Sequence, residues 1–147
     1  MKRKPRPKAN AVLALATKLP VPLEHHEQKL FFQLVDVAPR TKHLPIYAVP
    51  NGGHRHKATA AKLKAEGVRA GFPDINVDVP CGDTYHGLRI ELKRQSRSLS
   101  RVAPAPSAWH KLLRQHGYAV AVCYGALEAW GVLTAYLFGT YDEAVQQ

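Results

Sequence analysis

An alternation of apolar and polar residues between positions 74 and 93 constrains the fold of this chain more than any other feature of its sequence. Ile75, Val77 and Val79 alternate with polar residues in DINVDVP, and GLRIELK repeats the pattern over residues 87–93. A period of two is typical of half-buried strands, and the intervening CGDTYHG is rich in turn-forming residues. We therefore predict an antiparallel hairpin that turns near residues 82–84, with apolar side chains on one face and charged side chains on the other.

This hairpin brings Asp74, Glu91 and Lys93 to its polar face. Asp74 is expected to lie opposite or diagonal to Glu91, with their Cβ atoms about 5–8 Å apart. Two carboxylates this close repel each other unless a divalent cation lies between them, and their hard oxygens suit Mg²⁺ or Mn²⁺. Lys93 could then hold an attacking water or neutralise charge in a phosphoryl transition state. The alternative is a solvent-facing strand with cross-strand ion pairs.

An amphipathic helix is predicted over residues 23–38, before Pro39. Glu27 falls in the centre of its apolar stripe, Glu24 lies near the edge, and Gln28 lies one turn beyond Glu24. An acid at such a position either complements the helix dipole and stays solvated, or points into a site. The sequence leaves both interpretations open.

A basic region separates this helix from the hairpin. Residues 46–49 are predicted to form a short strand, residues 50–53 a turn, and residues 57–66 an alanine-rich helix. The histidines at 54 and 56 lack a third metal ligand nearby. Cationic side chains here favour phosphate contact, with plain solvation as the alternative. The candidate contacts, including one residue after the hairpin, are Asn51, Arg55, Lys57, Lys62, Lys64 and Arg94.

The C-terminal third of the chain is predicted to contain a helix from residue 109, a buried strand over 118–124 and a helix over 127–137. Together with the hairpin this indicates an α/β fold with a mixed central sheet flanked by helices. We expect a basic flexible arm over residues 1–22, one domain over 23–140 and a short tail over 141–147.

The charge of the chain favours a polyanionic partner. Twenty-one Lys and Arg against eleven Asp and Glu give a formal net charge of +10, which indicates nucleic acid but does not separate DNA from RNA. The first eight residues, MKRKPRPK, are either a phosphate-binding arm or a solubilising tail. No apolar run reaches the roughly 18 residues that a membrane span needs, and the two cysteines lack CxxC spacing. We therefore expect a cytoplasmic protein without a membrane segment, disulfide framework or zinc site.

Six motifs in order resemble the VRR-NUC nucleases, a family of the PD-(D/E)xK superfamily, and in particular the stand-alone domains of phages and bacteria. The resemblance covers roughly residues 23–138, and Asp74 with the ELK of 91–93 matches the superfamily signature. The motifs are Glu24-xxx-Gln28, VPNGG at 49–53, KLKAEGV at 62–68, GFPD at 71–74, GLRIELK at 87–93, and Trp109 through Gly117-Tyr118.

The resemblance implies a restriction-endonuclease-like core, with elements in an αβββαβ-type order around the mixed sheet. It implies a site for Mg²⁺ or Mn²⁺ in which Asp74, Glu91 and Lys93 are catalytic. The implied metal ligands are Glu24, Asp74, Glu91 and the Leu92 carbonyl. Glu27 and Gln28 stay as further candidates for a ligand or a supporting residue.

The resemblance also implies a metal-dependent DNA endonuclease that acts on branched, flap or junction DNA, as in DNA repair. A homodimer is compatible with a substrate that needs two cuts. One departure stands out, because Pro106 occupies the position where the family has a glutamine, three residues before Trp109. Gln95 is a candidate for partial replacement. This departure supports the alternative of a nucleic-acid-binding module whose cleavage is lost or depends on a partner.

Overall fold

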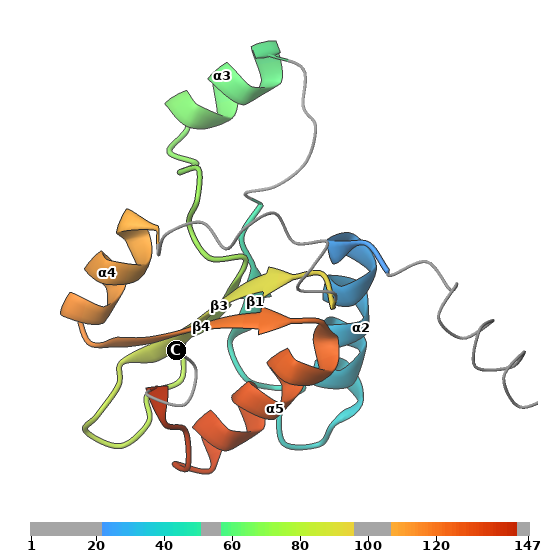
Figure 1. Cartoon of the computed structure of the whole chain (residues 1–147), viewed down its shortest axis with the longest axis vertical. Helices are drawn as coiled ribbons and strands as arrows, with labels where there is room; N and C mark the ends of the chain where they lie inside the picture. The colour runs from blue at the N-terminus through green and yellow to red at the C-terminus, as the bar shows by residue number, and fades with distance from the viewer. Residues whose placement is uncertain (1–21, 51–56, 96–106, 144–147) are drawn as a thin grey trace, which may run out of the picture.

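A computed structural model describes residues 22–50, 57–95 and 107–143 (Figure 1). Most of the predicted N-terminal arm, the candidate contacts Asn51 and Arg55, and Pro106 lie outside these residues. In chain order the elements are α2 (Glu24–Val37), β1 (Ile46–Ala48), α3 (Lys57–Ala65), β2 (Ile75–Val77), β3 (Gly87–Lys93), α4 (Ala108–Gln115), β4 (Tyr118–Tyr124) and α5 (Ala126–Leu137).

The strands form one mixed sheet in the order β1-β2-β3-β4. β1 with β2, and β2 with β3, are antiparallel, whereas β3 and β4 are parallel and are connected through α4. Ile75 pairs with Ile90 and Val77 with Leu88, so the hairpin turns near the predicted position. The α/β class and the mixed sheet flanked by helices are therefore confirmed.

Helices α2 and α5 cover one face of the sheet (Figure 1). They bury Phe31 and Leu133, among others, against Ile75, Ile90 and Leu92. Helix α4 packs on β4, and its His110 approaches Glu91, whose side chain points away from that core. The sheet thus lies between an α2–α5 layer and α4.

The prediction of half-buried strands is wrong for β2 and β3, because the second face of the sheet is also buried there. Asn76 and Arg89, expected to be solvated, are only 7% and 6% exposed. The guanidinium of Arg89 lies 4.2 Å from the ring centroid of Tyr118, and its Nη1 forms an ion pair with Asp78 (2.9 Å). β2 is also shorter than predicted and ends at Val77. Its partner β1 is bounded at residues 45 and 50 by prolines, which have no N–H to extend the ladder.

The ends of the domain also differ from expectation in detail. Tyr141, assigned to the tail, packs against the core, and the Oε1 of Glu143 accepts a 2.6 Å hydrogen bond from Nε of Arg114. The described chain contains no helix that is both long and apolar enough to cross a membrane.

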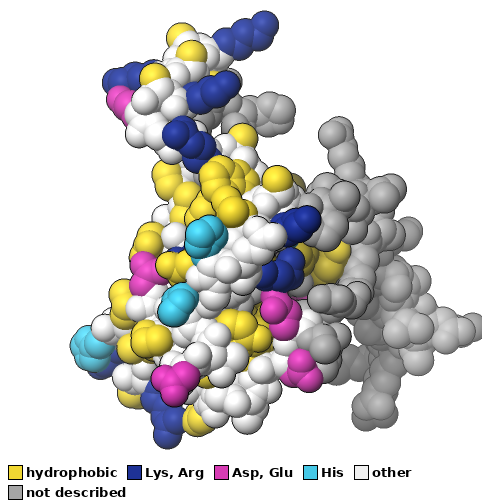
Figure 2. Space-filling model, turned by 90° about the vertical axis from the view of Figure 1, so that its left-hand side faces the viewer, with side chains coloured by type: hydrophobic (Ala, Val, Ile, Leu, Met, Phe, Trp, Pro, Cys, Tyr) yellow, Lys and Arg dark blue, Asp and Glu magenta, His cyan; other side chains and the backbone are white. Residues whose placement is uncertain are grey.

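Helix α3 projects away from the body in Figure 1. It has no buried residue, and no other helix or strand of the described chain packs against it. Figure 2 shows Lys and Arg side chains gathered on this projection. Only Leu63 of this helix is partly buried, so its helical conformation gains little from burial of an apolar face.

Candidate active site

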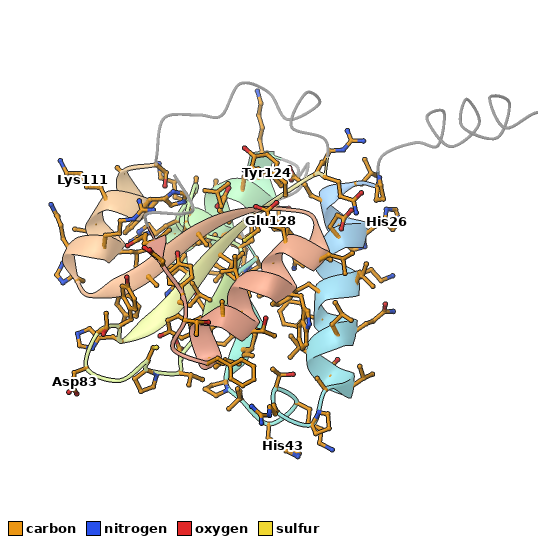
Figure 3. All side chains as sticks on the ribbon, turned by 60° about the horizontal axis from the view of Figure 1, so that its bottom comes forward. His26, His43, Asp83, Lys111, Tyr124 and Glu128 are labelled. Atoms are coloured by element: carbon orange, nitrogen blue, oxygen red, sulfur yellow. The ribbon has the colours of Figure 1, made fainter. Side chains whose placement is uncertain are left out.

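The site lies at the end of the sheet where α2 and α5 begin and β3 and β4 end. Figure 3 shows Tyr124, at the end of β4, and Glu128, in the first turn of α5, at the same end of the molecule as His26 of α2. His43 lies at the opposite end. Chain segments that are far apart in the sequence thus meet at one edge.

Asp74 is the residue immediately before β2. Its carbonyl accepts a hydrogen bond from the Val49 amide (2.7 Å), and its Oδ2 accepts one from the Leu92 amide (2.8 Å). The preceding Pro73 is fully buried and has a restricted backbone. Main-chain contacts from two neighbouring segments therefore fix the position of the Asp74 carboxylate.

Glu91 lies on β3 beside Asp74. Since Ile75 pairs with Ile90, the next position along the ladder sets Asp74 against Glu91. Both side chains point to the face opposite Ile75 and Ile90, because side chains alternate along a strand. This placement matches the one predicted from the sequence pattern.

The two carboxylates have different electrostatic environments. Burial, and then the charge of Glu91, raise the pKa of Asp74 from 3.8 to about 6. Burial acts in the same direction on Glu91, but His110 and Lys93 outweigh it and lower the pKa of that carboxyl. Glu91 is therefore the carboxylate whose charge Lys93 and His110 favour, and Asp74 is the one whose charge is disfavoured, by burial first and by Glu91 second.

Lys93 belongs to the same cluster. Its Nζ lies 2.5 Å from Oε1 of Glu91, and the side chains of Lys93 and Glu91 are 24% and 17% exposed. Burial alone would lower the pKa of Lys93, but Glu91, Glu24 and Asp74 raise it. The ammonium group is therefore charged and retains some access to solvent.

The two acids of α2 have separate positions. Glu24 is exposed, and its charge contributes to the raised pKa values of Asp74 and Lys93. Glu27 is 2% exposed, and its Oε2 accepts a 2.8 Å hydrogen bond from the Ala126 amide at the start of α5. Glu27 thus caps a helix, while Glu24 is the acid of α2 whose charge affects the pKa values of Asp74 and Lys93.

The donor set suits a hard divalent cation only in part. Asp74, Glu91 and the Leu92 carbonyl are oxygen donors of the kind that Mg²⁺ and Mn²⁺ take, and the two carboxylates repel each other without a cation. Within the described residues, however, no three His, Cys, Asp or Glu side chains are grouped to hold a metal ion. Glu24 therefore does not complete a three-carboxylate cage. Gln28 is half-buried one turn further along α2.

The candidate phosphate contacts are divided between two places. Lys57, Lys62 and Lys64 are exposed on α3, where Lys62 lies 3.8 Å from the carboxylate of Glu66. Arg94 is half-buried, and its Nε donates to the Pro22 carbonyl (3.3 Å). Arg94 thus connects the end of β3 to the segment before α2.

Gln95 was the candidate to replace the family glutamine. Its side chain lies against Gly125, where an added Cβ would come within 2.5 Å of its Cγ. Its described contact is therefore with the start of α5.

His110 is the residue at the site that sequence reasoning missed. It is 5% exposed in the first turn of α4, and its Nε2 lies 3.9 Å from Oε2 of Glu91. This separation exceeds hydrogen-bond range, so His110 influences Glu91 as a nearby polar group. The only signal in the sequence was a histidine among the apolar residues of a predicted amphipathic helix, next to Trp109.

An apolar pocket of about 720 Å³ lies elsewhere, where α2 and α5 end. Leu44, Val79 and Trp130 contribute to its lining. Asp74, Glu91 and Lys93 do not. It is therefore separate from the candidate site.

Both the sequence and the fold of this chain match those of known proteins. The model of the VRR-NUC domain family matches residues 20–127. A solved structure described as a VRR_NUC domain protein is 30% identical, with a TM-score of 0.67, and the alignment covers 88% of this chain and 99% of that one. A search of curated proteins gave no match. From the family match over most of its length and the shared fold, the chain belongs to the VRR-NUC domain family, a family of the nuclease type.

Proposed function

We propose that this protein is a divalent-metal-dependent DNA endonuclease whose centre is Asp74, Glu91 and Lys93. The observation that supports this most is the placement of Asp74 against Glu91, next to the Ile75–Ile90 pair, with the Lys93 ammonium at Glu91. The two carboxylate charges repel each other, and the charge of Glu91 adds to burial in raising the pKa of Asp74. A cation between the carboxylates would remove that repulsion. The chemistry of the pair therefore favours Mg²⁺ or Mn²⁺, with the Leu92 carbonyl as a backbone ligand.

The residues around the pair suit phosphodiester hydrolysis. When bound, the cation supplies positive charge that polarises the phosphodiester. Lys93 provides a charged donor at the same place, where it would orient the attacking water or neutralise charge that develops on the phosphoryl oxygens. Glu24 would act from the edge, as an outer partner of this cluster.

The proposed substrate is DNA, in particular branched, flap or junction DNA. The net charge of +10 supports a polyanion. The lysines of α3 support it further, because a nine-residue helix that packs against no other described helix or strand is only marginally stable in water. Phosphate groups bound by Lys57, Lys62 and Lys64 would stabilise this helix and extend the DNA-binding surface beyond the cut.

A second candidate function is a nucleic-acid-binding module without cleavage of its own. Two observations favour it: among the described residues no third carboxylate completes a metal cage, and the Lys93 ammonium pairs with Glu91. In that case the charged cluster would be a structural ion pair, and a partner would supply whatever the site lacks.

Cleavage assays separate the two functions. Purified protein is incubated with flap, fork, four-way-junction, linear duplex and single-stranded DNA, with matched RNA, in Mg²⁺, Mn²⁺ or chelator. We expect metal-dependent cleavage of branched DNA that Lys93→Ala abolishes while DNA binding remains. Lys42→Ala, at an exposed lysine after α2, is the matched control. Binding of every DNA without cleavage in any metal would establish the binding module instead, and cleavage of RNA alone would contradict the proposed substrate.

Direct metal binding is a second test, which does not depend on finding the right DNA. Free Mn²⁺ has a strong electron paramagnetic resonance signal that decreases on binding. We expect the wild-type protein to bind Mn²⁺ and Asp74→Asn to bind it at least tenfold more weakly. Equal binding by the two proteins would remove Asp74 from the ligand set.

A further inference from the structure

His110 is a buried polar side chain without a partner at its inner end. It is 5% exposed, and its Nε2 is among the few buried polar side-chain atoms of the described residues without a hydrogen bond. A buried polar group left unpaired destabilises the folded state. Oε2 of Glu91 lies 3.9 Å from this nitrogen. The side chain therefore faces a carboxylate of the site, just outside bonding distance.

The first turn of α4 is fastened to the segment that precedes Asp74. Oγ of Ser107 donates to the Gly71 carbonyl (3.2 Å), and Nε1 of Trp109 donates to the Ala70 carbonyl (3.1 Å). The ring of Trp109 also packs edge-on against Phe72, with centroids 5.4 Å apart. Because α4 is fixed at these points, its His110 has a set position relative to both carboxylates.

Ser107 also caps α4, since its Oγ accepts from the His110 amide (3.4 Å). One short segment therefore contacts the backbone before Asp74 and, through His110, the side chain of Glu91. The arrangement suits a role in setting the geometry of the carboxylate pair.

We propose that His110 is a positioning residue for Glu91, an inference that rests on the proposed nuclease function. Oε1 of Glu91 already has a partner in Lys93, and Oε2 faces His110. A small rotation of the carboxylate brings Oε2 within reach of an Nε2–H donor. With His110 bound to Oε2, Lys93 is free to leave Oε1 for a phosphate, and Glu91 keeps a fixed orientation and a hydrogen-bond partner.

Variants that differ only in this donor test the role. His110→Gln keeps an amide N–H near the position of Nε2, whereas His110→Leu removes the donor and preserves much of the volume. His116→Gln, at the exposed C-cap of α4, is the matched control. Outer partners of metal ligands typically contribute 10–100-fold to activity or metal affinity. We expect His110→Leu to lower kcat and Mn²⁺ affinity by at least tenfold with an unchanged KM for DNA, and His110→Gln to recover most of the loss.

A purely structural role predicts another pattern, in which both variants lose activity only in proportion to their folded fraction and the remaining folded enzyme has wild-type kcat. That result would overturn the proposal. So would a His110→Leu variant with kcat and Mn²⁺ affinity within twofold of the wild type.

The contact itself is measurable without any turnover. Nitrogen-15 NMR of the histidine side chains in the wild-type protein is compared with Glu91→Gln. We expect the Nε2 resonance of His110 to move in that variant, while that of His116 does not. An unchanged His110 resonance would refute the proposal even if the enzyme cleaves DNA. A changed resonance in a protein that cleaves no DNA would refute the nuclease function and leave the His110–Glu91 contact established.

Discussion

Replacing Asp74 with asparagine should make the metal-free protein more stable and the enzyme inactive. The charge of Asp74 is disfavoured by burial and by Glu91, which raise its pKa from 3.8 to about 6. Asparagine removes the charge and keeps an oxygen that can accept the hydrogen bond from the Leu92 amide. The same substitution removes a proposed metal ligand. Stability and function are therefore expected to change in opposite directions.

The size of the effect follows from the pKa difference. Each unit corresponds to about 1.4 kcal/mol, and after allowance for partial solvent access we expect Asp74→Asn to raise the free energy of unfolding by about 2 kcal/mol at pH 8. The folded-state pKa lies above the unfolded value, so the folded wild type binds the extra proton as pH falls. The advantage of the variant should be complete above pH 6 and vanish below about pH 4.

Urea denaturation in chelator at pH 8, 6 and 4 measures this dependence, with Asp83→Asn in the exposed hairpin turn as control. Mn²⁺ at 100 times the wild-type Kd should then stabilise the wild type by about 2.7 kcal/mol and the variant, which binds at least tenfold more weakly, by about 1.4 kcal/mol at most. The reasoning is refuted if Asp74→Asn is no more stable than wild type in chelator at pH 8, or if its advantage is the same at pH 4.

Contacts outside the carboxylate pair give three further predictions. Glu27→Ala removes the acceptor at the start of α5 and should lower the free energy of unfolding by about 2 kcal/mol in urea titrations. Glu24→Ala should leave this free energy unchanged and lower cleavage. The opposite pattern would reverse the roles assigned to the two acids. Gly125→Ala places a side chain at φ 91° and should cost about 1–2 kcal/mol in the same assay; an unchanged midpoint would contradict this. Lys62→Gln combined with Lys64→Gln should reduce the salt slope of DNA binding by about 2 with kcat unchanged; an unaltered slope would exclude α3 from phosphate contact.

The placement of Asp74 against Glu91 could be predicted because it depends on short-range pattern. Alternation fixes which side chains share a face, and a short turn between two alternating segments fixes their register. Ile75 opposite Ile90 then follows, and with it the position of both acids. The same local logic predicted the helix that carries Glu27 and placed this acid in the centre of the apolar stripe, but it left open whether the carboxylate is solvated; the structure buries it.

The burial of Arg89 could not be predicted from the hairpin. Alternation shows that Arg89 and Asn76 share a face but does not show what covers that face. The covering groups are remote in sequence: the ring of Tyr118 lies over the guanidinium, and Tyr47 donates to Asp78, which pairs with Arg89. A polar strand position that meets such partners becomes a buried network, although its sequence pattern is that of a solvated surface.

The partners of Glu27 and Glu91 show why residue type and spacing leave roles open. Glu27 and Glu24 are three residues apart on one helix, yet the first bonds to Ala126 of α5 and the second acts on the charges of the site. Only the crossing of α2 and α5 separates these roles, and no local pattern encodes it. His110 also has a role that no local pattern shows. It lies next to Glu91 because hydrogen bonds from Ser107 and Trp109 attach α4 to the segment before Asp74. In this domain the strand pattern locates Asp74 and Glu91, and the packing of α5 on α2 and of α4 beside β3 determines what surrounds Glu27 and the second oxygen of Glu91.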